Sequence, residues 1–103
     1  MAAPAWFVQH LEELRRLPGA RPTSARTLAE WAAQVGDGEA PSRATISRWV
    51  SGSTLPTTFE PLEVLVSAVR ERTRNPSRQA RETLLRSGWW RELYERALAT
   101  SVR

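Results

Sequence analysis

The chain has 103 residues, of which 15 are arginine and none is lysine or cysteine, and its formal net charge is +4. This length suits one domain over residues 1–103, and the lack of cysteine excludes a disulfide framework and a cysteine-ligated metal. The first 58 residues carry a net charge of +1 and the remaining 45 carry +3, so the charge allows attraction to phosphate without requiring it.

The first predicted helix covers residues 5–17, where apolar residues recur at helical spacing until Pro18-Gly19 ends the pattern. Glu12 and Glu13 interrupt its apolar stretch, and no cationic region precedes it. We therefore expect neither a signal peptide nor a membrane span, no membrane partner, and a cytoplasmic location.

A second helix is predicted over residues 24–35, with either Thr23 or Ser24 as its N-cap. One face of it is formed by residues spaced i, i+4 and i+7: Leu28, Ala32 and Val35. Residues 36–41 then form a joint with two glycines and a proline, which regular elements do not tolerate in their interior.

A third, short helix is predicted over residues 42–51, with Ser42 as N-cap and Gly52 as the residue of positive φ that ends it. One arc of this helix carries only small and cationic side chains: Arg43, Ala44, Ser47, Arg48 and Ser51. The opposite arc carries the apolar ones: Ile46, Trp49 and Val50. A helix this short is not stable alone, so we expect the apolar arc to be held against a scaffold.

The rest of the chain is predicted to form a loop at residues 53–58, in which Leu55-Pro56 folds back over the scaffold, and C-terminal helices at about residues 60–100. These helices are expected at residues 60–73, 77–86 and 89–99, with Gly88 as a break before the last. No segment alternates polar and apolar residues over the length of a strand. The predicted fold class is all-α, a compact bundle of five to six short helices.

The helices at residues 24–35 and 42–51, with their extended turn, resemble the helix-turn-helix of the lambda-repressor-like (Xre) family, in a variant common in high-GC bacteria. Leu28 with its paired alanines and the Ser-Arg-Ala-Thr-Ile start of the recognition helix carry the resemblance, and Leu55-Pro56 and residues 90–97 extend it. The joint has six residues, where a compact helix-turn-helix has about 3 or 4. The resemblance implies a transcriptional regulator that binds double-stranded DNA with helix 42–51 in the major groove.

The candidate base-contacting residues lie on the polar arc of that helix. Arg43 and Arg48 each carry a guanidinium that can donate twice to guanine or once to a phosphate. Arg43 is the first candidate, because the N-terminal end of a recognition helix contacts the base edges. Ser47 and Ala44 can meet a base edge or a thymine methyl group. The alternative for both arginines is a solvated side chain on a surface helix.

Three more residues are candidates for contact with the DNA backbone. Ser42 and Thr45 stand at a helix start, where hydroxyls and free amides favour a phosphate, although capping alone explains Ser42. Thr27 is included because the resembled family typically grips the backbone there. The densest basic run is a further, weaker candidate, since such a run is usually a solvated helix end. It comprises Arg70, Arg72, Arg74, Arg78 and Arg81.

The aromatic residues are predicted to anchor the core, with the alternative that Trp89, Trp90 and Tyr94 form part of an exposed partner surface. His10 has no second metal ligand near it in sequence, and the chain lacks a Gly-rich phosphate loop and a nucleophile-base pair. We therefore predict no enzyme, no cofactor and no metal site, and no residue pattern indicates a small-molecule effector.

The main alternative function is a protein-interaction module on the same scaffold, either an adaptor or the N-terminal input domain of a larger signalling or defence protein. A third reading is an architectural protein that binds DNA without sequence preference. The dependence of binding on salt distinguishes DNA binding from protein binding, because binding through several phosphates weakens steeply with ionic strength. If the chain forms a homodimer, the C-terminal helices are the expected interface.

Overall fold

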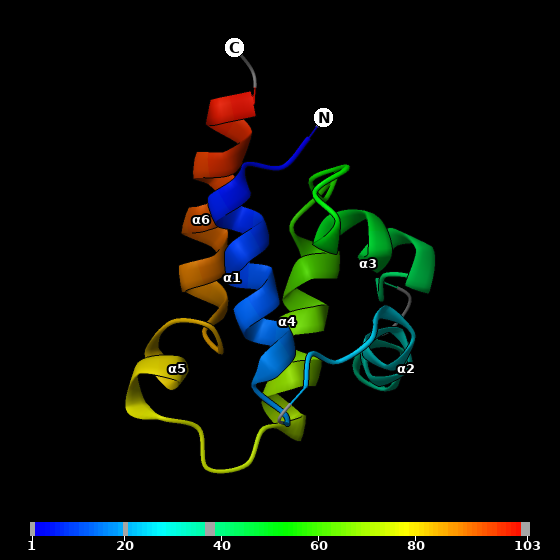
Figure 1. The fold of residues 1–103 in the computed structure, drawn as a ribbon, viewed down its shortest axis with the longest axis vertical. Helices are drawn as coiled ribbons and strands as arrows, with labels where there is room; N and C mark the ends of the chain where they lie inside the picture. Colours follow the sequence, from blue (N-terminus) through cyan, green and yellow to red (C-terminus); the bar gives the residue numbers. More distant parts are fainter. Residues whose placement is uncertain (1, 20, 37–38, 102–103) are drawn as a thin grey trace.

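The computed structural model describes residues 2–19, 21–36 and 39–101, and within these ranges the chain folds into six α-helices with no strand (Figure 1). The helices are α1 (Ala5–Arg16), α2 (Ala25–Val35), α3 (Arg43–Val50), α4 (Glu60–Arg72), α5 (Arg78–Glu82) and α6 (Ser87–Ser101). The predicted all-α class is confirmed. None of these helices, within the described ranges, is long and apolar enough to cross a membrane.

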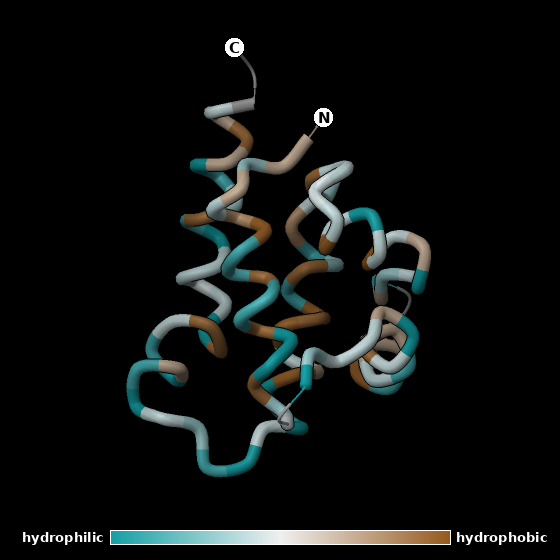
Figure 2. The backbone as a smooth tube through the Cα atoms, viewed as in Figure 1, coloured by the Kyte–Doolittle hydropathy of each residue, from teal (hydrophilic) through white to brown (hydrophobic). Residues whose placement is uncertain are grey.

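α1, α4 and α6 contact one another and enclose most of the core, and α1 is seen between the other two in Figure 1. The fully buried rings of Phe7 in α1 and Trp90 in α6 meet edge to face, with centroids 5.9 Å apart, an arrangement that aromatic quadrupoles favour. Figure 2 shows the hydrophobic segments of α1 and α4 in the middle of the molecule, whereas the connection to α5 is mostly hydrophilic.

α2 packs against α4, and α3 contacts both α2 and α1. Leu28 and Ala32 form the predicted buried face of α2, and Val35 is partly buried. Gly36 follows α2 where the backbone passes close to α4. A Cβ atom at this position would lie 2.8 Å from Cγ1 of Val64, so the approach of α2 to α4 requires glycine.

Hydrogen bonds and burial fix the connections before α2 and after α3. The amide and hydroxyl of Thr23 both donate to the carbonyl of Arg15 at 2.9 Å, and Nε of Arg15 donates to the carbonyl of Thr23 at 2.9 Å. Of the two predicted caps it is Ser24 that caps α2. Leu55 and Pro56 are buried, as expected for a loop that folds back over the scaffold.

The predicted end of the fifth helix is wrong by four residues, and the predicted start of the last helix is wrong by two. α5 ends at Glu82 rather than at Arg86, because Thr83 has the non-helical angles φ −123° and ψ −87°. α6 begins at Ser87, so Gly88 lies in its first turn instead of breaking the chain before it. Glycine destabilises a helix chiefly in its interior, which is why the first turn accommodates it.

The aromatic residues of α6 are not an exposed surface. The exposed fraction is 0% for Trp90 and 5% for Tyr94, and Trp89 is half-buried. Nε1 of Trp90 donates to the carbonyl of Leu84 at 2.7 Å, and the hydroxyl of Tyr94 donates to the carbonyl of Pro56 at 2.7 Å. Both rings therefore anchor neighbouring loops to α6, and the expectation of a partner surface on Trp90 and Tyr94 is wrong.

Candidate nucleic-acid interface

α3 begins and ends at the residues that the sequence predicts. The hydroxyl of Ser42 accepts a hydrogen bond from the amide of Thr45 at 3.2 Å and donates to the hydroxyl of Thr45 at 3.0 Å. After the helix, Gly52 adopts φ +81° and its amide donates to the carbonyl of Trp49 at 3.1 Å. These local bonds satisfy backbone groups at both ends, so they hold a helix of only 8 residues in place.

The two faces of α3 are separated as the sequence predicts. Ile46 is fully buried, Trp49 is 2% exposed and Val50 is half-buried, and the contacts of α3 with α1 and α2 cover this side. The opposite side is open to solvent, with Thr45 half-buried beside it. Its exposed residues are Ser42, Arg43, Ala44, Ser47, Arg48 and Ser51.

The exposed face of α3 is positively charged and its arginines are available to a ligand. Residues 42–58 contain two arginines and no aspartate or glutamate. Among the described residues, the side chain of Arg43 makes no hydrogen bond or ion pair, and the side chain of Arg48 makes only a long contact of 3.5 Å from Nη2 to Oγ1 of Thr45. No strong interaction therefore has to break before either guanidinium binds another molecule.

The start of α2 repeats the capping arrangement of α3. Oγ of Ser24 accepts from the amide of Thr27 at 3.2 Å and donates to Oγ1 of Thr27 at 3.1 Å. Both helices thus begin with the sequence Ser-x-x-Thr, and each cap includes one exposed arginine, Arg26 in α2 and Arg43 in α3. Sequence reasoning missed Arg26, although the repeated pattern was there to indicate it.

A hydroxyl-rich hollow of about 260 Å³ lies beside α3, between this helix and the loop that follows it. Its lining includes Thr45 and Arg48 from α3 and Thr54, Thr57 and Thr58 from the loop. Hydroxyl groups and arginines are common phosphate ligands at DNA interfaces. The three loop threonines were not predicted as site residues, and their signal in the sequence is the hydroxyl-rich run that follows the helix.

The joint between α2 and α3 is described only in part. Pro41 is buried directly before the cap of α3, and Glu39 is exposed. Asp37 and Gly38, which belong to the predicted extended turn, lie outside the described residues. The candidate DNA-binding site is therefore described from two observations. α3 packs on α2 and α1, and both α2 and α3 begin with a capped first turn.

The basic run at residues 70–81 does not form one patch. Arg72 lies over the ring of Trp31 at 5.1 Å from its centroid, and Arg78 pairs with Glu82 at 3.3 Å. Arg70 and Arg81 instead line a hollow at the start of α6. The run is therefore divided between different neighbours and is separate from α3.

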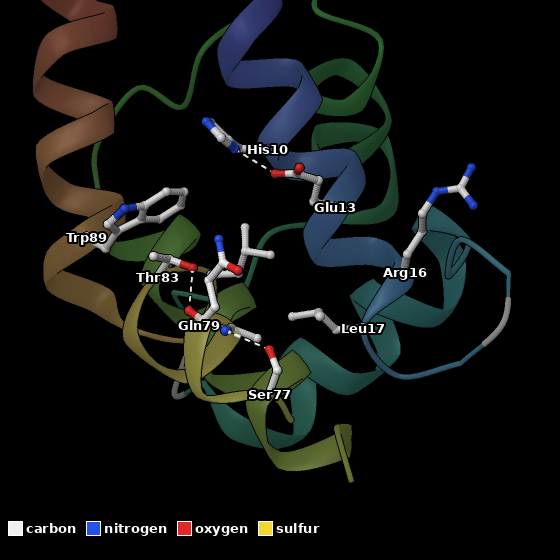
Figure 3. Close-up of a pocket in the computed structure, with 10 residues that line it drawn as sticks. His10, Glu13, Arg16, Leu17, Ser77, Gln79, Thr83 and Trp89 are labelled. Carbon is white, nitrogen blue, oxygen red and sulfur yellow. Dashed lines mark hydrogen bonds and ion pairs between the residues drawn. The ribbon is translucent and has the colours of Figure 1, made fainter. Parts of the chain in front are cut away.

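Another hollow, of about 470 Å³, lies among α1, α5 and the start of α6 (Figure 3). Nδ1 of His10 and Oε1 of Glu13 are 2.7 Å apart, and the imidazole meets the ring of Trp89 edge to face at 5.0 Å. Arg16 is part of the lining, and its guanidinium extends away from the other labelled side chains in Figure 3. In the described part of the chain, no three His, Asp or Glu side chains are grouped as metal ligands would be.

Comparisons of the chain with protein-family models, with curated proteins and with solved structures gave no match. The resemblance to the Xre family therefore depends on the motifs at residues 24–56 and 90–97. For the functional conclusion, the geometry of α3 is the main support.

Proposed function

We propose that this chain is a sequence-specific DNA-binding protein that places α3 in the major groove of double-stranded DNA and regulates transcription. The observation that carries the proposal is the exposed face of α3, where two unpaired arginines flank small residues on an anchored and capped helix. A face of this kind lets the helix backbone come close to base edges, because its other side chains are small and only the two arginines extend far from the helix.

Arg43 and Arg48 would make the principal contacts to the bases. They are five residues apart, which separates their Cα atoms by about 7.5 Å along the helix axis. Ala44 and Ser47 lie between them on the same arc, where a methyl group and a hydroxyl suit thymine and a base edge. We therefore expect a recognition motif of a few base pairs that includes guanine.

The caps of the two helices would hold the backbone of the DNA. Ser42 and Thr45 at α3 and Thr27 at α2 present hydroxyls beside the positive ends of helices. Arg26, exposed in the first turn of α2, adds a cation to this set. These contacts would position α3 without reading sequence.

A single short helix reads too few base pairs for a specific site, so we propose that the chain binds as a homodimer through its C-terminal helices. Such dimers contact half-sites about 34–36 Å apart. The enriched DNA motif is therefore expected to be palindromic.

The proposal is tested by selecting bound fragments from a randomised duplex pool at low and at near-physiological salt. The unmodified chain should enrich a short motif, and its affinity should fall steeply as salt rises. Arg43→Ala should lose about 1–3 kcal/mol of binding at that motif while its binding to random duplex changes little. Arg16→Ala is the matched control, because it removes one exposed arginine from α1, outside α2, α3 and the C-terminal helices, and should leave the motif unchanged.

The alternative of a protein-interaction module is suited by the modest net charge and by the number of tryptophans. Trp90 and Tyr94 are buried and give no exposed surface to this alternative, whereas Trp89 is half-buried and lines the hollow beside His10. If a folded sample enriches no duplex motif, the DNA proposal is wrong. Enrichment that Arg43→Ala leaves intact would contradict the assignment of α3 as the reading helix.

A further inference from the structure

A hollow of about 530 Å³ lies between the end of α4, the segment after it, α5 and the start of α6. Three arginines line this arginine pocket: Arg70 from α4, Arg81 from α5 and Arg86 just before α6. We propose that the arginine pocket binds the phosphate group of a small phosphorylated molecule. This site goes beyond DNA binding, and its existence does not depend on whether α3 binds DNA.

The charge of the arginine pocket is not neutralised by the protein. None of the three arginines forms an ion pair with a described residue, and no carboxylate lines the hollow. Glu82, the acidic residue on α5, pairs instead with Arg78 at 3.3 Å. Three guanidinium groups around one hollow repel one another, and a dianion between them would turn this repulsion into charge-assisted hydrogen bonds.

Arg70 is held in position for such a ligand. Its Nη1 donates to the carbonyl of Leu85 at 3.1 Å, and its Nη2 donates to the hydroxyl of Ser67 at 3.3 Å. A guanidinium has five N–H donors, so these bonds orient the group and leave other donors for a ligand. The guanidinium groups of Arg81 and Arg86 make no hydrogen bond to described side chains or backbone, and their donors are free.

The first turn of α6 adds donors to the same hollow. Ser87 and Gly88 line it, and the backbone bond from the amide of Trp90 to the carbonyl of Arg86 at 3.3 Å is the first of the helix. A Cβ atom at Gly88 would lie 3.6 Å from Nη2 of Arg86, so this guanidinium lies against the helix start. A hydroxyl, free amides and the helix dipole would all favour the anion that the arginines attract.

The shape of the arginine pocket indicates a ligand larger than phosphate alone. Pro76 and Leu85 form an apolar part of its lining, and its volume of about 530 Å³ is within the range of small-molecule sites. α3 and α5 lie on opposite sides of the molecule in Figure 1, so the bound phosphate is not one from the duplex on α3. A nucleoside monophosphate has the required phosphate and a compact body.

The test is a titration of the 103-residue chain, at constant ionic strength, with adenosine monophosphate, inorganic phosphate, and adenosine as the unphosphorylated control. Thermal unfolding and amide NMR shifts are recorded for each. Adenosine monophosphate should raise the unfolding temperature in a saturable way, because it binds only the folded state, and should shift the amides of Ser87 and Gly88. Inorganic phosphate should shift the same amides with lower affinity, and adenosine should shift neither.

Variants assign the binding to the arginine pocket. Arg81→Gln and Arg86→Gln should each weaken binding of adenosine monophosphate at least tenfold. Arg78→Gln removes the same charge from the same short helix without facing the hollow, and it should bind like the unmodified chain. Equal losses in Arg78→Gln and Arg81→Gln, shifts that never saturate, or equal effects of adenosine and its monophosphate would overturn the proposal. If Arg86→Gln does not fold, the comparison of Arg81→Gln with Arg78→Gln still shows whether adenosine monophosphate binds in the arginine pocket.

Discussion

α3 and α6 are both amphipathic, but they use their large side chains in opposite ways. α3 exposes Arg43 and Arg48, which extend from a face of small residues, whereas α6 buries Trp90 and Tyr94 against α1, α4 and the loop at Pro56. The difference follows from their neighbours, because α6 lies in the three-helix core while α3 contacts α1 and α2 from one side. A cluster of aromatic residues in a short sequence is therefore a poor guide to an exposed surface, and an arc without large apolar residues is a better one.

The largest effect should come from removing the buried ring of α6. Trp90→Ala should lower the free energy of unfolding by about 3–5 kcal/mol, because the ring is fully buried and packs on Phe7. Trp89→Ala is the control from the next position, which is half-buried, and should cost clearly less. Urea unfolding followed by circular dichroism measures both. Equal costs would mean that the two tryptophans do not differ in burial as described.

Gly52 tests whether the end of α3 needs a left-handed residue. Gly52→Ala should destabilise the protein by about 1–2 kcal/mol, since a Cβ atom is disfavoured in the left-handed region. The new methyl group would also lie 3.2 Å from Cγ2 of Val8. Gly19→Ala is the matched control, because a Cβ atom there meets nothing within 4 Å. An unfolding midpoint for Gly52→Ala equal to that of the unmodified chain would contradict this account of the helix end.

A smaller effect is expected at the start of α3. Ser42→Ala removes the N-cap and should cost about 1 kcal/mol of stability, because the amide of Thr45 loses its acceptor. Ser47→Ala makes the same chemical change on the exposed face, where alanine is the better helix former, and should not destabilise the protein. Thermal unfolding of the two variants side by side distinguishes capping from a general effect of serine.

The smallest effect depends on pH. Burial raises the pKa of Tyr94, and the negative charge of Glu60 raises it further. The unfolded chain ionises this phenol near pH 10, so the contribution of Tyr94 to stability is complete below that pH and is lost as the pH rises above it. The chain has one tyrosine and neither lysine nor cysteine, so this titration is not masked by other side chains.

Tyr94→Phe should flatten the decrease in stability above pH 10. At neutral pH the same variant should lose about 1 kcal/mol, because the carbonyl of Pro56 loses its donor. Urea unfolding from pH 7 to pH 11 measures both effects. A decrease above pH 10 that is equally steep in Tyr94→Phe would show that another group is responsible.

Much of the helical pattern could be predicted because its determinants are local. Ser24 and Ser42 cap the helices they precede, and Gly52 ends α3, since a cap is decided within about one turn of chain. The boundaries of α5 and α6 could not be predicted in this way. Leu85 is buried in the core. This burial is a tertiary effect, and it accompanies the turn between the end of α5 at Glu82 and the start of α6 at Ser87.

The exposed face of the candidate site was also predictable, because the periodicity of a short helix assigns each residue to one of two sides. The structure exposes Arg43 and Arg48 and buries Ile46 and Trp49 as expected. The arginine pocket could not be found from sequence. Its arginines come from three segments, and only their packing shows that Arg70 and Arg86 face one hollow while Arg78 faces Glu82.

The most direct test of the central claim is an amide NMR titration of the chain with the duplex that the selection enriches. The largest shifts should fall on residues 42–48 of α3 and on Arg26 and Thr27 of α2, and the amides of α6 beyond its first turn should stay unchanged apart from any dimer contact. Shifts concentrated on α5 and α6, with α3 unaffected, would contradict the assignment of α3 as the helix that reads DNA.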